Sequence, residues 1–349
     1  MTETEHRTFQ TVEIVAPDEW DSLVARLGGD DVYERYGYHA ASAHLEVPGT
    51  QPVLLHFTDL GEGGEVALPL LLRPLPDGAA GFDATSAYGY GGPVALGEID
   101  RAAFGAALDA WAAERGVVAT FLRFHPLLAN ARLAPAGAEL IELGSTVGWR
   151  VTPERGELLP LMHSHHRRAA RKADRAELEL RVTVAPESLD AFRTMYDETM
   201  RRQEATAFYF FDDAYWQALI DDCGGDVVLI EGLLEGEPVA ALLCMAHGAN
   251  LHYHLGASTD VARSIGASNR CFLAAAEWAQ ANELTTFHLG GGVGGGSDSP
   301  LFTFKHRYDP ESEPLAFHIG KLVHDTARYR ELAGTDSTDG YFPPWRAPA

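Results

Sequence analysis

The sequence predicts a mixed α/β (α+β) protein made of two similar units in tandem, each a mixed, largely antiparallel sheet flanked by helices. Three pairs of matching segments predict this duplication. Val15-Ala16-Pro17 returns as Val184-Ala185-Pro186, Tyr88–Pro93 returns as His252–Ala257, and Ala110-Trp111-Ala112 returns as Glu277-Trp278-Ala279. The pairs occur in the same order at offsets of 164 to 169 residues, as in an internal repeat. We therefore predict one unit over residues 1–155 and a second over residues 156–349.

The first unit is predicted to run strand, two helices, hairpin, strand, helix and strand. Its first helix begins at Pro17 and ends near Gly28, because proline suits the first helical turn and glycine the position after the last. The expected segments are a strand over 11–15, helices over 17–28 and 31–45, hairpin strands over 53–57 and 66–72, a strand over 88–93, a helix over 104–115 and a strand over 119–124.

The second unit repeats this order after an added basic helix over 163–176. The expected segments are a strand over 180–184, helices over 189–205 and 213–222, hairpin strands over 227–232 and 238–246, a strand over 251–255, a helix over 269–282 and a strand over 285–289. The tail from Gly334 is rich in Gly, Pro, Ser and Asp, so we expect little fixed structure there.

Composition narrows the class of protein. The net charge of −23 argues against a protein that coats nucleic acid or anionic membranes without specificity, although it leaves room for a local basic patch. The three cysteines form no C-x-x-C pair, so neither a disulfide framework nor a cysteine zinc site is indicated. Because no signal peptide and no apolar run of membrane-spanning length occurs, we expect a cytoplasmic protein with no membrane span.

The basic helix is the densest cationic segment of this acidic chain. Arg168, Arg171, Lys172 and Arg175 recur at helical spacing and so share one face. Such a face attracts a polyanion such as phosphate, diphosphate or a tRNA backbone. The alternative is an ordinary solvated face paired with nearby glutamates. The adjoining histidines lack a carboxylate at ligand spacing, so we expect no metal.

Further candidates follow this helix. Arg202 ends the next helix, where it either binds substrate phosphate or simply favours the helix dipole. Tyr209 belongs to an aromatic run that either walls a pocket or packs in the core. We also assign Tyr88 and Tyr90 of the first unit to substrate binding.

His254 is a candidate general base, because it and His252 project from the same face of a predicted strand. A hydrogen-bonded core histidine is the competing interpretation. Arg263–Ser268 approximates the R-x-x-G-x-G/A loop that holds the pyrophosphate of acyl-CoA, or else caps the following helix.

A glycine-rich loop over 290–296 follows the last predicted strand. Its glycines, among them Gly291 and Gly292, allow backbone amides to approach a ligand closely. No Gly-Lys-Ser/Thr follows, which excludes a P-loop. Lys305 comes shortly after the loop and either donates to an oxyanion during acyl transfer or lies on the surface.

These segments resemble the FemABX-like family, tandem GNAT-fold aminoacyltransferases that use aminoacyl-tRNA. The resemblance is carried by His166–Ala173, Thr199-x-x-Arg202, Tyr253–Leu255 and Leu301-Phe-x-Phe304-Lys305. It implies that Lys305 lies beside the reacting carbonyl and that Arg202 meets substrate phosphate. The long helical arm of some members is missing, and the first unit lacks an evident lysine beside Tyr36-Gly-Tyr38.

Three functions therefore remain open. The first hypothesis is amide formation by transfer of an aminoacyl group from aminoacyl-tRNA, without a further cofactor, to an amine acceptor such as a peptidoglycan precursor, a peptide or a secondary-metabolite scaffold. The second is N-acylation with acyl-CoA as donor. The third is a non-catalytic binding module for a phosphorylated ligand.

Overall fold

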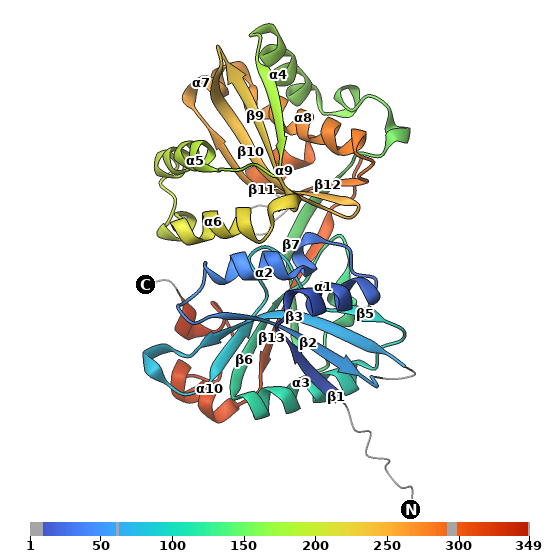
Figure 1. Cartoon of the computed structure of the whole chain (residues 1–349), viewed down its shortest axis with the longest axis vertical. Helices are drawn as coiled ribbons and strands as arrows, with labels where there is room; N and C mark the ends of the chain where they lie inside the picture. Colours follow the sequence, from blue (N-terminus) through green and yellow to red (C-terminus); the bar gives the residue numbers. More distant parts are fainter. Residues whose placement is uncertain (1–9, 61–62, 292–298, 348–349) are drawn as a thin grey trace, which may run out of the picture. The chain divides into compact units, whose positions relative to one another are not determined.

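The computed structural model describes residues 10–60, 63–291 and 299–347. The chain forms two compact units: unit 1 contains Met1–Glu142 and Phe317–Ala349, and unit 2 contains Leu143–Ala316 (Figure 1). This division differs from the predicted boundary between residues 155 and 156. Strand β7 (Glu139–Arg150) pairs with a strand of unit 2, and strand β13 (Leu315–Val323) pairs with a strand of unit 1. The C-terminal segment therefore belongs to unit 1.

The sheet of unit 1 runs in the order β1-β2-β3-β4-β6-β13, and a seventh strand, β5, pairs with β3. Its pairs are antiparallel except β4 with β6, which is parallel. The strands, besides β13, are β1 (Gln10–Ile14), β2 (Gln51–Thr58), β3 (Glu65–Pro74), β4 (Phe82–Thr85), β5 (Val94–Leu96) and β6 (Val117–Arg123). The helices are α1 (Pro17–Arg26), α2 (Tyr36–Ala43), α3 (Arg101–Arg115) and α10 (Thr326–Ala333).

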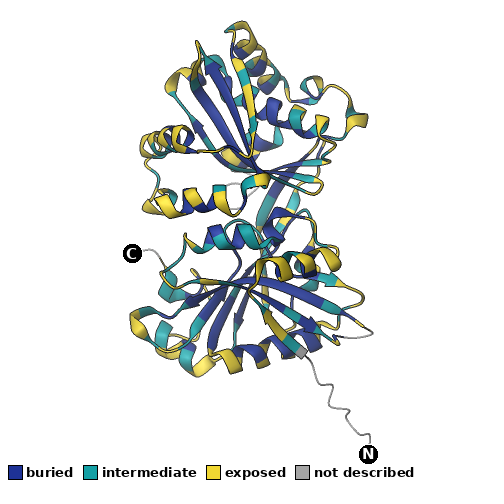
Figure 2. Ribbon diagram, viewed as in Figure 1, coloured by how far each residue is buried: buried dark blue, intermediate teal, exposed yellow. Residues whose placement is uncertain are grey.

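The core of unit 1 follows from the alternation of side chains along its strands. Leu55 of β2 joins Phe104 and Trp111 of α3 on one face, while Leu54 joins Trp20 of α1 on the other. Each fully buried side chain of this size contributes roughly 1.5–3 kcal/mol. Both faces of the sheet are therefore covered, and Figure 2 shows its strands as the buried centre of the unit.

Unit 2 is a six-stranded sheet, in the order β7-β12-β11-β10-β9-β8, with β11 and β12 parallel and the other pairs antiparallel. Its remaining strands are β8 (Glu179–Val184), β9 (Val227–Leu234), β10 (Glu237–His247), β11 (Asn250–Ser258) and β12 (Thr286–Gly290). The helices are α4 (Ser164–Arg175), α5 (Asp190–Arg202), α6 (Asp213–Asp221), α7 (Asp260–Ile265), α8 (Ala267–Ala281) and α9 (Pro300–His306).

The two units repeat the order of helix pair, hairpin, strand, helix and strand that the duplication predicts. The predicted strand over 88–93 is wrong, because these residues form the loop between β4 and β5, where Gly89 and Gly92 have positive φ and interrupt an extended backbone. In unit 2, Ala275, Ala276 and Ala279 let α8 lie close to the sheet, where they pack with Phe287 and Trp149. Within the described residues, no helix has the length and apolar character needed to cross a membrane.

The tail from Gly334 departs from its prediction, because residues up to 347 are folded against unit 1. Asp83 of β4 is fully buried and needs donors. Trp345 Nε1 and Arg346 Nε donate to its carboxylate over 2.8 and 2.9 Å. The polar tail therefore has a fixed structure because Trp345 and Arg346 bind the buried carboxylate of Asp83, which lies far away in the sequence.

Candidate functional site

The parallel strands β11 and β12 of unit 2 stop pairing before either strand ends. Their register covers Asn250–His252 of β11 and Thr286–His288 of β12, whereas β11 continues to Ser258. At the same place, a bulge in the pairing of β11 with β10 leaves His254 without a register partner. Ligands of α/β sheets favour the carboxyl ends of parallel strands, and bulges often re-aim a side chain beside a functional site.

Lys305 lies at this point. It is 7% exposed, its Nζ donates a hydrogen bond of 2.6 Å to Gly291 O just beyond β12, and the Nζ lies 5.4 Å from the centre of the Tyr253 ring on β11. Burial lowers the pKa of Lys305 to about 8. Among the described residues no carboxylate pairs with Lys305, so its charge is available to an anionic group.

Helix α9 holds Lys305 in place. Ser299 caps the helix, and Pro300 occupies its first turn. The Phe304 ring packs on His166 and Tyr308, and His166 Nε2 donates to Phe304 O over 2.8 Å. The buried side of α4 therefore anchors the helix that carries Lys305.

Tyr253 is the neighbour of Lys305 whose role the sequence did not predict. Its ring packs on Phe272 of α8 with ring centres 5.0 Å apart. A Cβ atom at Gly256 would collide with the Tyr253 hydroxyl, so this glycine makes room for the ring. The sequence shows Tyr253 as an aromatic residue between two histidines, which does not reveal its neighbours. Its contact with Lys305 becomes visible only in the folded structure.

His254 lies on the opposite face of β11. Its Nε2 and the Tyr215 hydroxyl of α6 are hydrogen-bonded at 2.6 Å, whereas Tyr253 faces α8. Burial is the main cause that lowers the pKa of His254 to about 4, and the charge of the nearby His252 adds to the effect. The ring is therefore neutral at pH 7. The structure does not bring the two predicted catalytic residues together on one face.

His252 takes part in a buried polar chain within unit 2. Its Nδ1 lies 3.3 Å from His288 Nδ1, and His288 Nε2 lies 3.0 Å from Thr146 Oγ1. Thr146, His252 and His288 lie far apart in the sequence, so no sequence motif predicts that they form one hydrogen-bonded chain.

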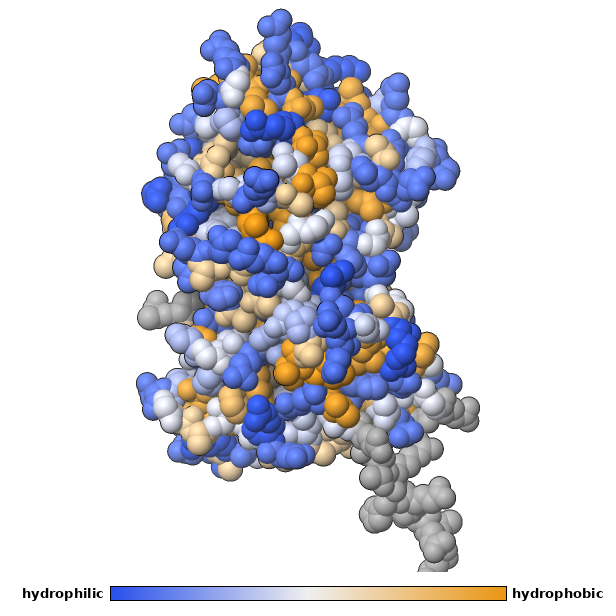
Figure 3. All heavy atoms as spheres, viewed as in Figure 1, coloured by the Kyte–Doolittle hydropathy of each residue, from blue (hydrophilic) through white to orange (hydrophobic). Residues whose placement is uncertain are grey.

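The basic face of α4 is exposed. Arg168, Arg171, Lys172 and Arg175 make no ion pair or hydrogen bond with another described side chain, and Glu177 and Glu179 do not neutralise them. In Figure 3 hydrophilic residues dominate the surface over α4, at the top of the view. Arg167 differs, because it donates to the carbonyl oxygens of Pro160 and Met162. The four cations remain free to bind an anionic partner.

The other predicted residues of unit 2 lie as follows. Arg202 donates to Ser258 O and lies 3.4 Å from Asp260, so it secures the end of β11 and the start of α7. Tyr209 is half-buried beside the exposed Phe208, while Phe211 enters the core. Gly291 accepts from Lys305, and Gly292 lies outside the described residues.

Tyr88 and Tyr90 lie in unit 1, between β4 and β5. Tyr38 Oη donates to Tyr88 O over 2.7 Å, and the Tyr90 ring packs edge-on against Tyr33 and at a tilt against His125. The loop around them is therefore held by α2 and the end of β6.

The predicted pyrophosphate loop has a packing role. Gly266, with φ +84°, ends α7 and directly precedes α8, and a Cβ there would lie 2.5 Å from Ala169 O of α4. Helix α4 therefore lies against the N-terminus of α8, where a diphosphate would bind.

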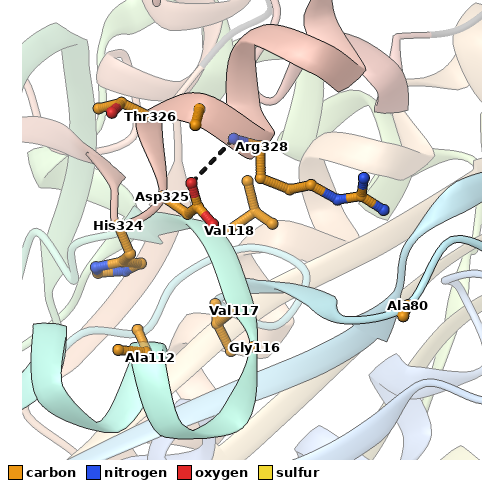
Figure 4. A pocket seen from close by; sticks show the side chains of 11 residues that line it. Ala80, Ala112, Gly116, Val117, Val118, His324, Asp325, Thr326 and Arg328 are labelled. Atoms are coloured by element: carbon orange, nitrogen blue, oxygen red, sulfur yellow. Dashed lines mark hydrogen bonds between the residues drawn. The ribbon is translucent and has the colours of Figure 1, made fainter.

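A separate cavity of 430 Å³ lies in unit 1 between α3 and the start of α10 (Figure 4). It is lined by Ala112, Gly116, Val118 and residues 324–328. The Asp325 carboxylate caps α10 by accepting from Arg328 N, so the helix end is already occupied by an anion. None of the predicted site residues lines this cavity.

The comparisons with known proteins support the fold. The acetyltransferase (GNAT) domain family matches residues 162–306, which lie inside unit 2. No curated protein matches the chain.

Solved structures extend the likeness to most of the chain. FemX is 14% identical with a TM-score of 0.66, covering 93% of this chain and 99% of FemX. L-PGS from Bacillus licheniformis is 15% identical with a TM-score of 0.57, covering 88% and 92%. The tandem GNAT protein from the clavulanic acid biosynthesis pathway is 14% identical with a TM-score of 0.53, covering 91% and 99%. At these identities the likeness is one of fold.

Proposed function

We propose that this protein, an acyltransferase with a GNAT domain in unit 2 and a FemX-like fold, transfers an aminoacyl group from aminoacyl-tRNA to an amine. Lys305 carries the proposal. It is a buried cation without a carboxylate partner among the described residues, and it lies where β11 and β12 stop pairing. The acceptor is a peptidoglycan precursor, a peptide or a secondary-metabolite scaffold that bears a free amine.

The reaction needs no covalent intermediate on the protein. The acceptor nitrogen attacks the ester carbonyl of the donor, the carbon–oxygen bond to the tRNA ribose breaks, and the proton lost by the amine passes to the departing ribose oxygen, which becomes a hydroxyl. Negative charge develops on the carbonyl oxygen, where the Lys305 ammonium stabilises it. The Tyr253 ring and Gly291 carbonyl hold that ammonium in position.

The basic face of α4 supports RNA as the donor. Four exposed cations without partners among the described side chains, in a chain of net charge −23, form a local site for a phosphate backbone. Contacts of this kind position a ligand without taking part in the chemistry.

Acyl-CoA is the second candidate donor, since the family that matches unit 2 is named for acetyl transfer. The close approach of Ala169 to Gly266 counts against it, because α4 takes up space at the N-terminus of α8. A non-catalytic binding module remains the third candidate.

The test is a transfer assay with a panel of amines, using charged tRNA in one arm and acetyl-CoA in the other. We expect product in the charged-tRNA arm and none in the acetyl-CoA arm. Substitution of Lys305 should abolish or strongly reduce that product. Turnover with acetyl-CoA alone would favour the second candidate. Tight tRNA binding without product in either arm would favour the third.

A further inference from the structure

The first turn of α4 holds the last turn of α9 through two hydrogen bonds. The main-chain N of His163 donates to Arg307 O over 2.9 Å, and His166 Nε2 donates to Phe304 O over 2.8 Å. Carbonyl groups in the last turn of a helix lack a donor within the helix and take one from elsewhere. Phe304 directly precedes Lys305 in the chain, so His166 restrains the peptide group from which Lys305 extends.

Helix α9 depends on such a restraint. It has seven residues, Pro300–His306, and an isolated helix shorter than about 12 residues is marginal in water. Ser299 caps its beginning, and the contacts with α4 hold its end. Lys305 lies in the last turn, so the position of its side chain depends on the end that α4 holds.

The ring of His166 makes a second connection to Lys305. Its centre lies 4.8 Å from that of the Phe304 ring. The Phe304 ring packs on Phe272 at 6.1 Å, and Phe272 packs on Tyr253 at 5.0 Å. Because the Tyr253 ring lies against the Lys305 ammonium, His166 supports Lys305 through the backbone and through its aromatic neighbour.

The hydrogen bond to α9 requires one neutral form of the His166 ring. Burial lowers the pKa of His166 to about 4 against the opposing bond to Phe304, and the charges of His165, Arg307 and His163 lower it further. A neutral imidazole has one N–H, which lies at Nε2 because a carbonyl oxygen can only accept. His166 Nδ1, 3.4 Å from Nδ1 of the exposed His165, is then an acceptor. The ring is thus a neutral donor at pH 7.

We propose that His166 is a positioning residue for acyl transfer, which holds Lys305 where its ammonium meets the developing oxyanion. The effect on rate rests on the proposed function, whereas the effect on Lys305 itself does not. A catalytic group misplaced by about 1 Å can cost roughly 10²-fold in rate, so the restraint of one peptide group is sufficient to matter. The basic face lies on the same helix, so α4 places both the donor-binding surface and Lys305.

The first test compares two variants in the transfer assay. His166→Phe keeps a ring and removes the donor, whereas His166→Gln keeps an N–H donor. We expect His166→Phe to lower kcat by roughly 10- to 10²-fold with KM for charged tRNA nearly unchanged, and His166→Gln to recover part of the loss. His39→Phe in unit 1 is the matched control, because it removes an equally buried ring that bonds Arg35 O over 2.9 Å. Equal kcat in His166→Phe and this control contradicts the proposal.

A second readout does not require turnover. Competitive labelling with acetic anhydride, followed by mass spectrometry, measures the pKa of Lys305 in each protein. Loss of the restraint should expose the ammonium to water, so in His166→Phe the pKa should rise from about 8 to about 9 or higher, and in His39→Phe it should not. An unchanged Lys305 pKa in folded His166→Phe overturns the proposal. A raised pKa without transfer activity in any protein supports the positioning of Lys305 and counts against acyl transfer alone.

A third measurement covers variants that fail to fold. In the unmodified protein, the ring ¹⁵N chemical shifts of His166 at pH 7 report which nitrogen carries the hydrogen. We expect the hydrogen at Nε2. A hydrogen at Nδ1 would leave His166 unable to donate to Phe304 O and would overturn the proposal.

Discussion

At the scale of single residues, burial decides what each ionisable group can do. Lys305 loses water on burial, which lowers its pKa to about 8, and no carboxylate of the described residues pairs with it. His254 loses water beside another histidine, which lowers its pKa to about 4 and leaves it neutral. The first environment suits a group that meets developing negative charge, and the second suits a fixed hydrogen-bonding role.

Substitution of Lys305 tests the proposed chemistry. If its ammonium stabilises the oxyanion, Lys305→Ala should lower kcat by roughly 10²–10³, about 3–4 kcal/mol of barrier, with donor binding nearly unchanged. The measurement is a single-turnover rate at saturating donor. A rate within about twofold of the unmodified protein would exclude this role and turn attention to His254.

The pH profile gives the same prediction a second readout. Because the charged form is required, the rate should fall as pH rises through about 8, where Lys305 loses its proton. Lys305→Arg keeps its charge over this range and should lack the falling limb. A rate that instead rises through pH 8 in the unmodified protein alone would indicate that neutral Lys305 acts as a base.

The buried His39 of α2 should make the stability of the protein depend on pH. Burial lowers its pKa to about 4 from the ordinary 6.5, so the folded state binds fewer protons than the unfolded state between these values. Stability is thus complete above pH 6.5 and is lost as pH falls to 4, by about 3 kcal/mol for this residue. Urea titrations at pH 7 and pH 4.5 measure the free energy of unfolding at each pH. The loss of this free energy between the two pH values should be smaller in His39→Leu than in the unmodified protein. Equal differences would show that His39 does not contribute.

At the scale of elements, α4 has two faces with different tasks. Ala170 and Ala173 are buried against the core of unit 2, and His166 holds α9. The opposite face carries the four exposed cations, which pair with no side chain in the described part of the chain. Its sequence spacing was sufficient to predict this division, because side chains three and four residues apart share a helix face.

Neutralising the exposed face tests its role in binding. Arg168, Arg171 and Lys172 changed together to Ala should raise KM more than they lower kcat, since the contacts position the donor. Filter binding of tRNA at several salt concentrations is the measurement, and the salt slope should become shallower in the variant. Arg132→Ala, an exposed cation of unit 1, is the control. Unchanged affinity and an unchanged slope would argue that α4 is only a solvated surface.

At the scale of the whole molecule, the sequence predicted the shared order of helix pair, hairpin, strand, helix and strand and the added helix α4, but it placed a strand over 88–93 where the structure has a loop. It did not predict that β7 and β13 enter the sheets of different units, because a pattern of apolar residues shows that a strand exists and not which strand it pairs with. The same limit applies to the site. Lys305 and the glycines precede or follow recognisable elements, whereas Tyr253 and His166 gain their surroundings only through long-range contacts.

The C-terminal segment gives the sharpest test of this architecture. Asp83 is fully buried and bonds Arg73, Trp345 and Arg346, so the tail satisfies a charge at the centre of unit 1. Arg346→Gln should lower the free energy of unfolding by roughly 1–3 kcal/mol, because a buried carboxylate loses a charged donor while keeping two others. Arg330→Gln is the matched control, since its pair with Asp336 is exposed to solvent and should contribute little. Denaturant titration of both variants decides the matter: equal midpoints would mean that Arg346 does not stabilise unit 1, and that Arg73 and Trp345 are sufficient for Asp83.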